Sequence, residues 1–188
     1  MGYAYGTEEW ESAYRGLVEE RLDGVDKPYV MGSPEWVASF EKLVQDDDHY
    51  KEVAKTWEGT VVIHILPKPE IGLNCDIYEL MDLWHGDCRS IKLVPGDIAE
   101  EADFILTGEY ERWESVVKGE LDVVKAMMQG KIKLKGSLPK IVRYVKASKR
   151  LVDLAAQVDT QFHTDMEEEK RAEYSNWFDG FCSSFRIN

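Results

Sequence analysis

The stretch from Ala102 to Val158 limits the fold of this chain more than any other part. It contains a short apolar strand over 103–107, a helical region over 109–129, and a strand over 131–135 in which lysines alternate with apolar residues. An amphipathic helix follows. Helical spacing and the period of two that is typical of strands therefore occur close together. This pattern predicts a sheet packed against helices, with large apolar surfaces and no catalytic motif.

Three further strands are expected earlier in the chain. The segment 60–66 is rich in β-branched residues and ends at a proline. The segments 76–85 and 89–94 predict two more strands, joined by a hairpin over 85–88. With the strands over 103–107 and 131–135, the sequence predicts an α+β fold with a five-stranded sheet.

Helical segments surround these strands. Thr7 is a suitable N-cap for a first helix over 8–22, and Ser33 followed by Pro34 marks the start of a second. After Asp159 the chain becomes acidic and then aromatic. We therefore expect an N-terminal helical extension over 1–32, a central domain over 33–158, and a C-terminal extension over 159–188.

The C-terminal aromatic residues Phe178, Phe181 and Phe185 leave two roles open. They could form a lid over an apolar opening, or dock onto the rest of the protein as ordinary core. Either role requires an ordered tail.

Charge is distributed unevenly along the chain. The net charge is −13, which argues against nucleic-acid binding because phosphate recognition needs a basic surface. The segment 131–150 is the exception, with eight basic residues and no acidic one. Without those eight, the remaining 15 basic and 36 acidic residues give −21. This segment is either a solvated face or a contact for anionic head groups, and Lys140, Arg143 and Lys146 are the candidates for such a contact.

The sequence predicts a cytoplasmic protein. It contains no run of about 18 uncharged apolar residues, which a membrane span requires, and no apolar segment of the kind that directs secretion. Cys75, Cys88 and Cys182 are an odd number without CxxC spacing. That pattern favours reduced thiols over a disulfide framework.

An enzyme is the less favoured hypothesis. His85 and Cys88 stand three residues apart, and a metal could use both if His64 or Cys75 came near. A Cys88 nucleophile with a histidine base is the other catalytic option. The spacings that identify metal sites, nucleotide loops and nucleophile elbows are missing. We therefore predict no catalytic residue, no metal site and no cofactor.

A group of large and flexible apolar side chains suits a pocket for an apolar ligand. Methionine in particular adapts to ligands of variable shape. Each of these residues could equally be core, so the prediction concerns the group and not one residue. The candidate lining residues are Trp84, Phe104, Leu106, Trp113, Val117, Leu121, Met127, Met128, Ile132 and Leu134.

Three runs within 102–136 resemble the sterol carrier protein-2 family. They are the strand Ala102-Asp103-Phe104-Ile105-Leu106-Thr107, the helix with Gly119-Glu120-Leu121-Asp122 and Lys125-Ala126-Met127-Met128, and the strand Gly130-Lys131-Ile132-Lys133-Leu134-Lys135-Gly136. The resemblance extends over about 33–158.

This resemblance implies a five-stranded sheet covered on one face by helices, with an apolar tunnel that accepts a fatty acyl chain, an isoprenoid, a sterol or a similar lipid. The expected function is lipid binding and transport without catalysis, with transient contact to an anionic membrane. The alternative is an accessory module of lipid or acyl-thioester metabolism that binds a partner and has a closed cavity. The terminal extensions could block the tunnel, line it or form a homodimer.

Overall fold

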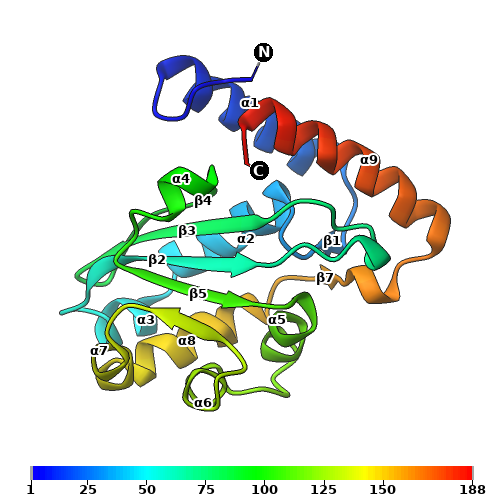
Figure 1. Cartoon of the computed structure of the whole chain (residues 1–188). Helices are drawn as coiled ribbons and strands as arrows, with labels where there is room; N and C mark the ends of the chain where they lie inside the picture. Colours follow the sequence, from blue (N-terminus) through cyan, green and yellow to red (C-terminus); the bar gives the residue numbers. More distant parts are fainter. Residues whose placement is uncertain (1, 188) are drawn as a thin grey trace.

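The five expected strands form one sheet in the computed structural model, which describes residues 2–187. The strand order is β4-β3-β2-β5-β6 (Figure 1). Neighbouring strands are antiparallel except β2 and β5, which are parallel. The strands are β2 (Glu58–Ile65), β3 (Ile77–Trp84), β4 (Asp87–Leu93), β5 (Phe104–Gly108) and β6 (Lys133–Lys135).

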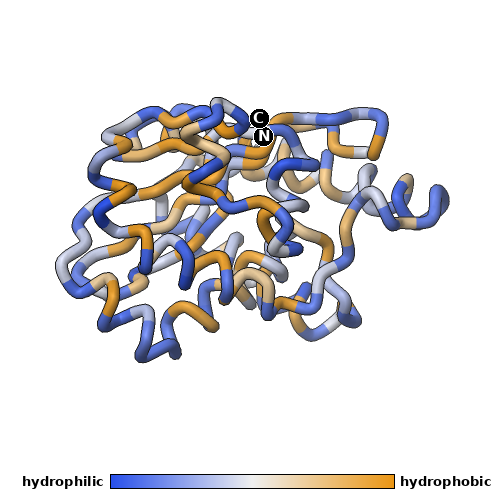
Figure 2. The backbone as a smooth tube through the Cα atoms, turned by 90° about the horizontal axis from the view of Figure 1, so that it is seen from below, coloured by the Kyte–Doolittle hydropathy of each residue, from blue (hydrophilic) through white to orange (hydrophobic). Residues whose placement is uncertain are grey.

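The two faces of the sheet are both apolar but unequal. Val61, Ile63 and Ile65 of β2 point to the inner face, which carries the main core. Val62 points to the outer face and joins a small cluster that includes Ile105. The hydropathy of the chain follows this arrangement, since hydrophobic stretches run along the strands and the outer turns are mostly hydrophilic (Figure 2).

Helices cover the inner face, as expected. α2 and α8 lie behind the sheet in the view of Figure 1, whereas α4 lies against the outer face. The expected helix over 109–129 is divided at Gly119, and the helix expected after Ser137 is divided at Tyr144. The helices are α2 (Pro34–Gln45), α3 (Asp48–Val53), α4 (Gly96–Ala99), α5 (Tyr110–Val117), α6 (Val123–Met128), α7 (Leu138–Arg143) and α8 (Val145–Ala155).

The two terminal extensions pack against each other. α1 (Glu8–Gly24) and α9 (Glu168–Phe185) lie side by side beyond the β4 edge of the sheet (Figure 1). Thr7 caps α1 as predicted, because its hydroxyl accepts a hydrogen bond from Trp10 N. A short parallel pair that the sequence does not predict, β1 (Tyr29–Val30) with β7 (Thr160–Gln161), joins the end of the N-terminal extension to the start of the C-terminal one.

Aromatic side chains fill the contact between α1 and α9. Phe185 lies edge-on to Trp10 and Tyr14, with ring centroids 5.8 and 5.7 Å apart. Phe178 and Phe181 are fully buried in the same cluster. Of the two roles considered for these phenylalanines, the structure shows core packing.

The expectation of three reduced thiols is wrong for two of them. Cys75, which precedes β3, forms a disulfide with Cys182 of α9. The sequence gives no sign of this pair because 107 residues separate the two cysteines and α9 brings them together. Cys88 is free and buried.

His163 is likewise buried, although it stands in an acidic stretch of sequence. It lies in η2 (His163–Asp165), where its Nδ1 is 3.2 Å from the carbonyl oxygen of Ile71 in η1 (Pro69–Ile71). Burial lowers the pKa of His163 to about 4, so the ring is neutral at physiological pH.

No helix among the described residues is long and apolar enough to span a membrane.

The tip of the hairpin between β3 and β4 packs against α3, and glycine substitutions test this contact. Gly86 has φ +85°, and a Cβ atom there would overlap the carbonyl oxygen of Lys51. Gly119 has a similar φ of +76° but faces open space. We expect Gly119→Ala to cost about 1 kcal/mol of unfolding free energy from backbone strain alone. Gly86→Ala should cost at least about 1 kcal/mol more.

Urea unfolding of the two variants measures this difference. Equal losses of stability would show that the hairpin tip is not packed against α3.

Candidate functional site

Two apolar cavities lie between the inner face of the sheet and the helices. Cavity 1 has a volume of about 90 Å³ and is surrounded by β2, β3, β5, α3, α5, α6, α7 and α8. Cavity 2 has a volume of about 80 Å³ and is surrounded by β2, β3, α2, α5 and α8. Five residues line both cavities: Ile63, Met81, Trp113, Leu151 and Val152. The cavities are therefore neighbours, separated only by side chains.

Cavity 2 also receives residues from outside the expected central domain. Met31 and Gly32, which belong to the predicted N-terminal extension, line it beside Trp36 of α2. Gly32 has φ +82°, and a Cβ there would lie 2.8 Å from Ile77 Cδ1. Glycine therefore lets the chain pass close to β3. Of the roles left open for the extensions, the N-terminal one lines a cavity.

The cavities are smaller than an occupied lipid site. Pockets for small ligands are generally about 300 Å³ or larger. An apolar chain would therefore have to displace side chains, and those that divide the two cavities are the first candidates. Met81 and Met127 are suited to such movement because their unbranched side chains have several accessible rotamers.

Four of the ten candidate lining residues reach these two cavities. Leu106 and Met127 line cavity 1, Val117 lines cavity 2, and Trp113 lines both. The indole of Trp113 is held in place by a 3.1 Å hydrogen bond from Nε1 to the carbonyl oxygen of His64. Leu121 lines a separate, more polar depression between α5, α6 and α8.

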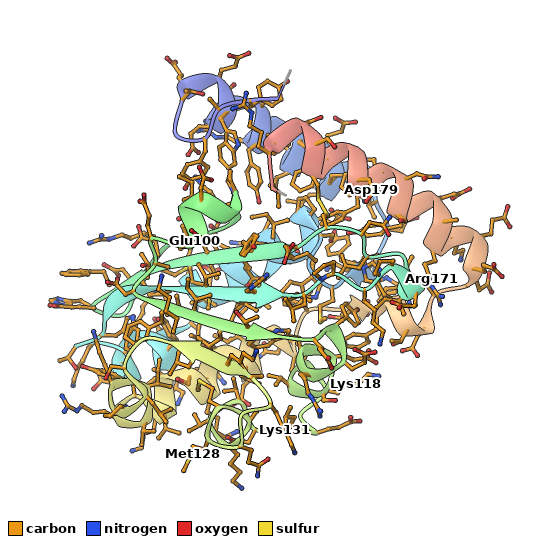
Figure 3. The ribbon with its side chains drawn as sticks, viewed as in Figure 1. Glu100, Lys118, Met128, Lys131, Arg171 and Asp179 are labelled. Atoms are coloured by element: carbon orange, nitrogen blue, oxygen red, sulfur yellow. A yellow bond between two sulfur atoms is a disulfide. The ribbon has the colours of Figure 1, made fainter. Side chains whose placement is uncertain are left out.

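The remaining five candidates lie outside the cavities. Trp84 is 39% exposed at the end of β3, and Met128 is 68% exposed. Met128 and Lys131 point outward at the end of α6 (Figure 3). Phe104 packs against Trp57, whereas Ile132 is buried and Leu134 is half-buried near the β6 edge. Trp84 and Met128 directly follow the cavity-lining residues Leu83 and Met127 and point away from the core. Phe104, Ile132 and Leu134 instead belong to the main core without reaching either cavity.

Several residues that line the cavities are not among the ten candidates predicted from the sequence. The inner-face row of β3 is Ile77, Glu79, Met81 and Leu83, and three of these line a cavity. Burial alternates strictly along β3, but the outward row also contains Tyr78, Leu80 and Trp84, so the sequence alone does not identify the inward row. The contribution of Leu151 and Val152 from α8 likewise depends on tertiary packing.

Among the described residues, Glu79 is the one titratable group that lines cavity 2. It is only 4% exposed, and no hydrogen bond or ion pair joins its carboxyl group to any other described residue. Burial raises the pKa of Glu79 to about 8, from an ordinary value of 4.5. The carboxyl group is therefore mainly neutral at pH 7.

The residues of the catalytic hypothesis are dispersed. His64 lies near the C-terminal end of β2, with Nε2 2.6 Å from Asp76 Oδ1. His85 is next to the other end of β2, with Nε2 2.6 Å from Glu58 Oε1. Burial raises the pKa of the Cys88 thiol to about 12, which disfavours the nucleophilic thiolate. Within residues 2–187, no three His, Cys, Asp or Glu side chains gather in a way that could hold a metal ion.

The three candidate head-group residues are not equivalent. Lys140 Nζ donates a 2.5 Å hydrogen bond to the carbonyl oxygen of Glu58 and lies over the Trp57 ring, 5.0 Å from its centroid. Arg143 and Lys146 are exposed and form no ion pair with the described acidic residues. These two remain available for an external anion.

A protein-family model places this architecture among known proteins. The model of the SCP-2 sterol transfer family matches residues 40–149. The chain belongs to the SCP-2 sterol transfer family. The matched segment lies within the central domain expected over 33–158 and includes most of the lining of cavity 1.

Two solved structures support this membership. A crystal structure of sterol carrier protein 2 is 31% identical, with a TM-score of 0.63, and the alignment covers 68% of this chain and 98% of that one. The solution structure of a conserved protein from Thermus thermophilus is 29% identical, with a TM-score of 0.64, over 72% of this chain and 94% of that one. No curated protein matches the chain. Family membership supports lipid or sterol binding and transfer, and the extensions account for much of the unmatched length.

Replacement of Glu79 should change how stability depends on pH. Between its unfolded pKa of 4.5 and its folded pKa of about 8, the native state keeps a proton that the unfolded chain has lost. Stability therefore falls as pH rises through this window, by about 1.4 kcal/mol per pH unit. Glu79→Gln should remove this slope.

The measurement is urea unfolding of both proteins at pH 5, 6, 7 and 8. The difference between the two proteins isolates Glu79, because His163 and the other titrating groups contribute equally to both. Parallel curves would show that Glu79 has an ordinary pKa.

Proposed function

We propose that the protein binds one apolar chain along the two cavities and carries it between sites. The observation that supports this most directly is that cavities 1 and 2 share Ile63, Met81, Trp113, Leu151 and Val152 as a common wall. Movement of these side chains would join the cavities into one channel between the sheet and α8. Family membership independently supports lipid binding and transfer.

The energy for binding comes from burial of the ligand. Each methylene removed from water contributes about 0.8 kcal/mol, so a chain of about ten methylenes contributes about 8 kcal/mol. Displacement of packed side chains reduces this gain by about 1 to 3 kcal/mol, the usual cost of overpacking a core. A long chain therefore binds and a short one does not.

The entrance that we propose is the junction of α7 and α8. These helices carry Ile141, Ala147 and Leu151 toward cavity 1, while Val142 and Val145 are 45% and 43% exposed on the outside. Arg143 and Lys146 stand beside these two valines. Exposed apolar residues flanked by cations are typical of surfaces that bind an anionic membrane.

Tyr144 connects this entrance to the body of the protein. It lies between α7 and α8, lines cavity 1, and donates a 2.8 Å hydrogen bond to the carbonyl oxygen of Thr56. Contact of Val142 and Val145 with lipid would compete with this closed arrangement. The proposal therefore links membrane contact to opening of cavity 1.

A pair of methionine variants tests the channel. Met81→Trp should fill the wall between the cavities and weaken binding of a dansyl-labelled undecanoic acid at least tenfold. Met128→Trp makes the same exchange at an exposed position and should bind as the wild type does. Fluorescence titration measures the affinities, and circular dichroism with thermal melting checks that both variants fold.

Wild-type affinity in a folded Met81→Trp protein would exclude the proposed channel. Failure of the wild type itself to bind the probe would favour the accessory-module alternative, in which the small cavities remain closed.

Charge reversal tests the membrane contact. Arg143→Glu with Lys146→Glu should reduce binding to phosphatidylserine vesicles at least tenfold, since each cation near such a surface contributes about 1 kcal/mol. Lys131→Glu with Lys133→Glu changes net charge equally, but next to and within the edge strand β6, and should have a smaller effect. Vesicle co-sedimentation at 50 and 200 mM salt measures both. Equal losses in the two double variants would show that net charge alone attracts the protein.

A further inference from the structure

Three glutamates among the described residues are buried, and two of them have partners. Glu35 accepts hydrogen bonds from Arg21 at 3.2 and 2.7 Å, which joins α1 to α2. Glu114 accepts from Lys118 at 2.5 Å and from the hydroxyl of Thr164 at 2.8 and 2.9 Å. Glu79 is equally buried but has no such partner among the described residues. Its burial is therefore not explained by an interaction within the protein.

The surroundings of Glu79 are apolar on every side from which a ligand could approach. On the sheet, its neighbours across the two ladders are Ile63 of β2 and Leu93 of β4. Toward the helices, cavity 2 is lined by Trp36 and Phe40 of α2, and otherwise by apolar residues of α5 and α8 and the Met31–Gly32 segment. Glu79 is thus a single hydrogen-bonding group in an apolar cavity.

Neither of the two titratable side chains packed near Glu79, Tyr14 and Glu41, is a cation that could pair with its carboxylate. Tyr14 of α1 uses its hydroxyl to accept a hydrogen bond from Leu93 N, 3.0 Å away. Glu41 of α2 accepts from Ile91 N at 2.6 Å. Neither side chain lines cavity 2, and neither is a cation that would stabilise the ionised form of Glu79.

A protonated carboxyl group has one O–H donor and a carbonyl acceptor. A ligand hydroxyl can complement both, because it accepts one hydrogen bond and donates another. A carboxylate or phosphate in the same place would be a buried anion without a counter-ion, which is strongly unfavourable. The cavity therefore selects between head groups by their charge.

We propose that Glu79, in its protonated form, is a specificity-determining residue that hydrogen-bonds a neutral hydroxyl group at the deeply buried end of a long apolar ligand. The inference rests on the proposed function and assigns the chemical class of ligand that cavity 2 prefers. An alcohol lies with its hydroxyl against Glu79 and its tail toward cavity 1. A fatty acid instead enters tail first and leaves its carboxylate near Arg143 and Lys146.

Competition between two matched ligands tests the proposal. Hexadecan-1-ol and its methyl ether have the same alkyl chain, but the ether cannot donate a hydrogen bond. Each displaces the dansyl probe from wild type, Glu79→Gln and Glu79→Leu, and the readout is the ratio of the alcohol affinity to the ether affinity. Loss of the hydrogen bond should lower this ratio about tenfold in Glu79→Leu.

Glu79→Gln should keep the wild-type ratio within about threefold, because the amide also offers a donor and an acceptor. Val117→Leu is the matched control, since it alters an apolar residue of cavity 2 and should change both affinities alike. Thermal melting verifies the fold of each variant.

An unchanged ratio in Glu79→Leu would overturn the proposal while leaving ligand binding intact. If the wild type bound neither ligand nor the probe, the proposed function itself would fail. Because the ether reports chain binding without a donated hydrogen bond, the two failures are distinguishable.

Discussion

The position of α8 over the inner face of the sheet determines where space remains in this protein. Leu151 and Val152 meet both cavities, so a small shift of this helix changes the two together. Arg150 ties α8 to α3 through Asp47, whose carboxylate also accepts from Tyr50 N. That pairing holds the pKa of Asp47 below its ordinary value. The cover over the cavities is therefore anchored by charge at one point and by apolar packing elsewhere.

The terminal extensions hold the elements that line cavity 2 on the side of α2. Arg21 of α1 is paired with Glu35 at the start of α2, and Trp36 Nε1 donates to Thr160 Oγ1 of β7 at 2.8 Å. These contacts fix α2 and the Met31–Gly32 segment, which form the outer wall of cavity 2. The disulfide between Cys75 and Cys182 connects α9 to the segment before β3. The segment just before the central domain thus lines one end of the cavity system, and the C-terminal extension holds this end in place through β7.

Local patterns predict much of this fold because they depend on neighbouring residues. β-branched content, apolar runs and period-two alternation together located all five strands of the sheet, and the caps at Thr7 and Ser33 located two helices. The exceptions depend on contacts across long distances in sequence. The pairing of Tyr29 with Thr160, the disulfide of Cys75 and the burial of His163 all require α9 and its preceding segment to fold back.

The lining of the site was predicted less well for a related reason. Hydrophobic character identifies buried residues, but it does not separate those that border a void from those that fill the core. Phe104 and Ile132 are buried yet reach neither cavity, whereas Trp113 reaches both. A cavity forms where side chains from two packed elements do not fill the space between them. Its position therefore depends on how the elements pack together and not on the sequence of one segment. Glu79 is recognisable as unusual only when it is known that its side chain belongs to the inward-facing row of β3.

The inward orientation of Glu79 makes the two ends of the cavity system chemically different. At the α7 end, exposed Arg143 and Lys146 favour an anion that remains in water. At the α2 end, a neutral carboxyl group favours a hydroxyl that is fully buried. Exchange of Glu79 for a leucine would relieve the cost of burying an unpaired polar group, so its presence weakens the folded protein unless a ligand completes its hydrogen bonds. An interior that is less stable when empty than when filled is what a carrier requires, because ligand and closed structure then stabilise each other.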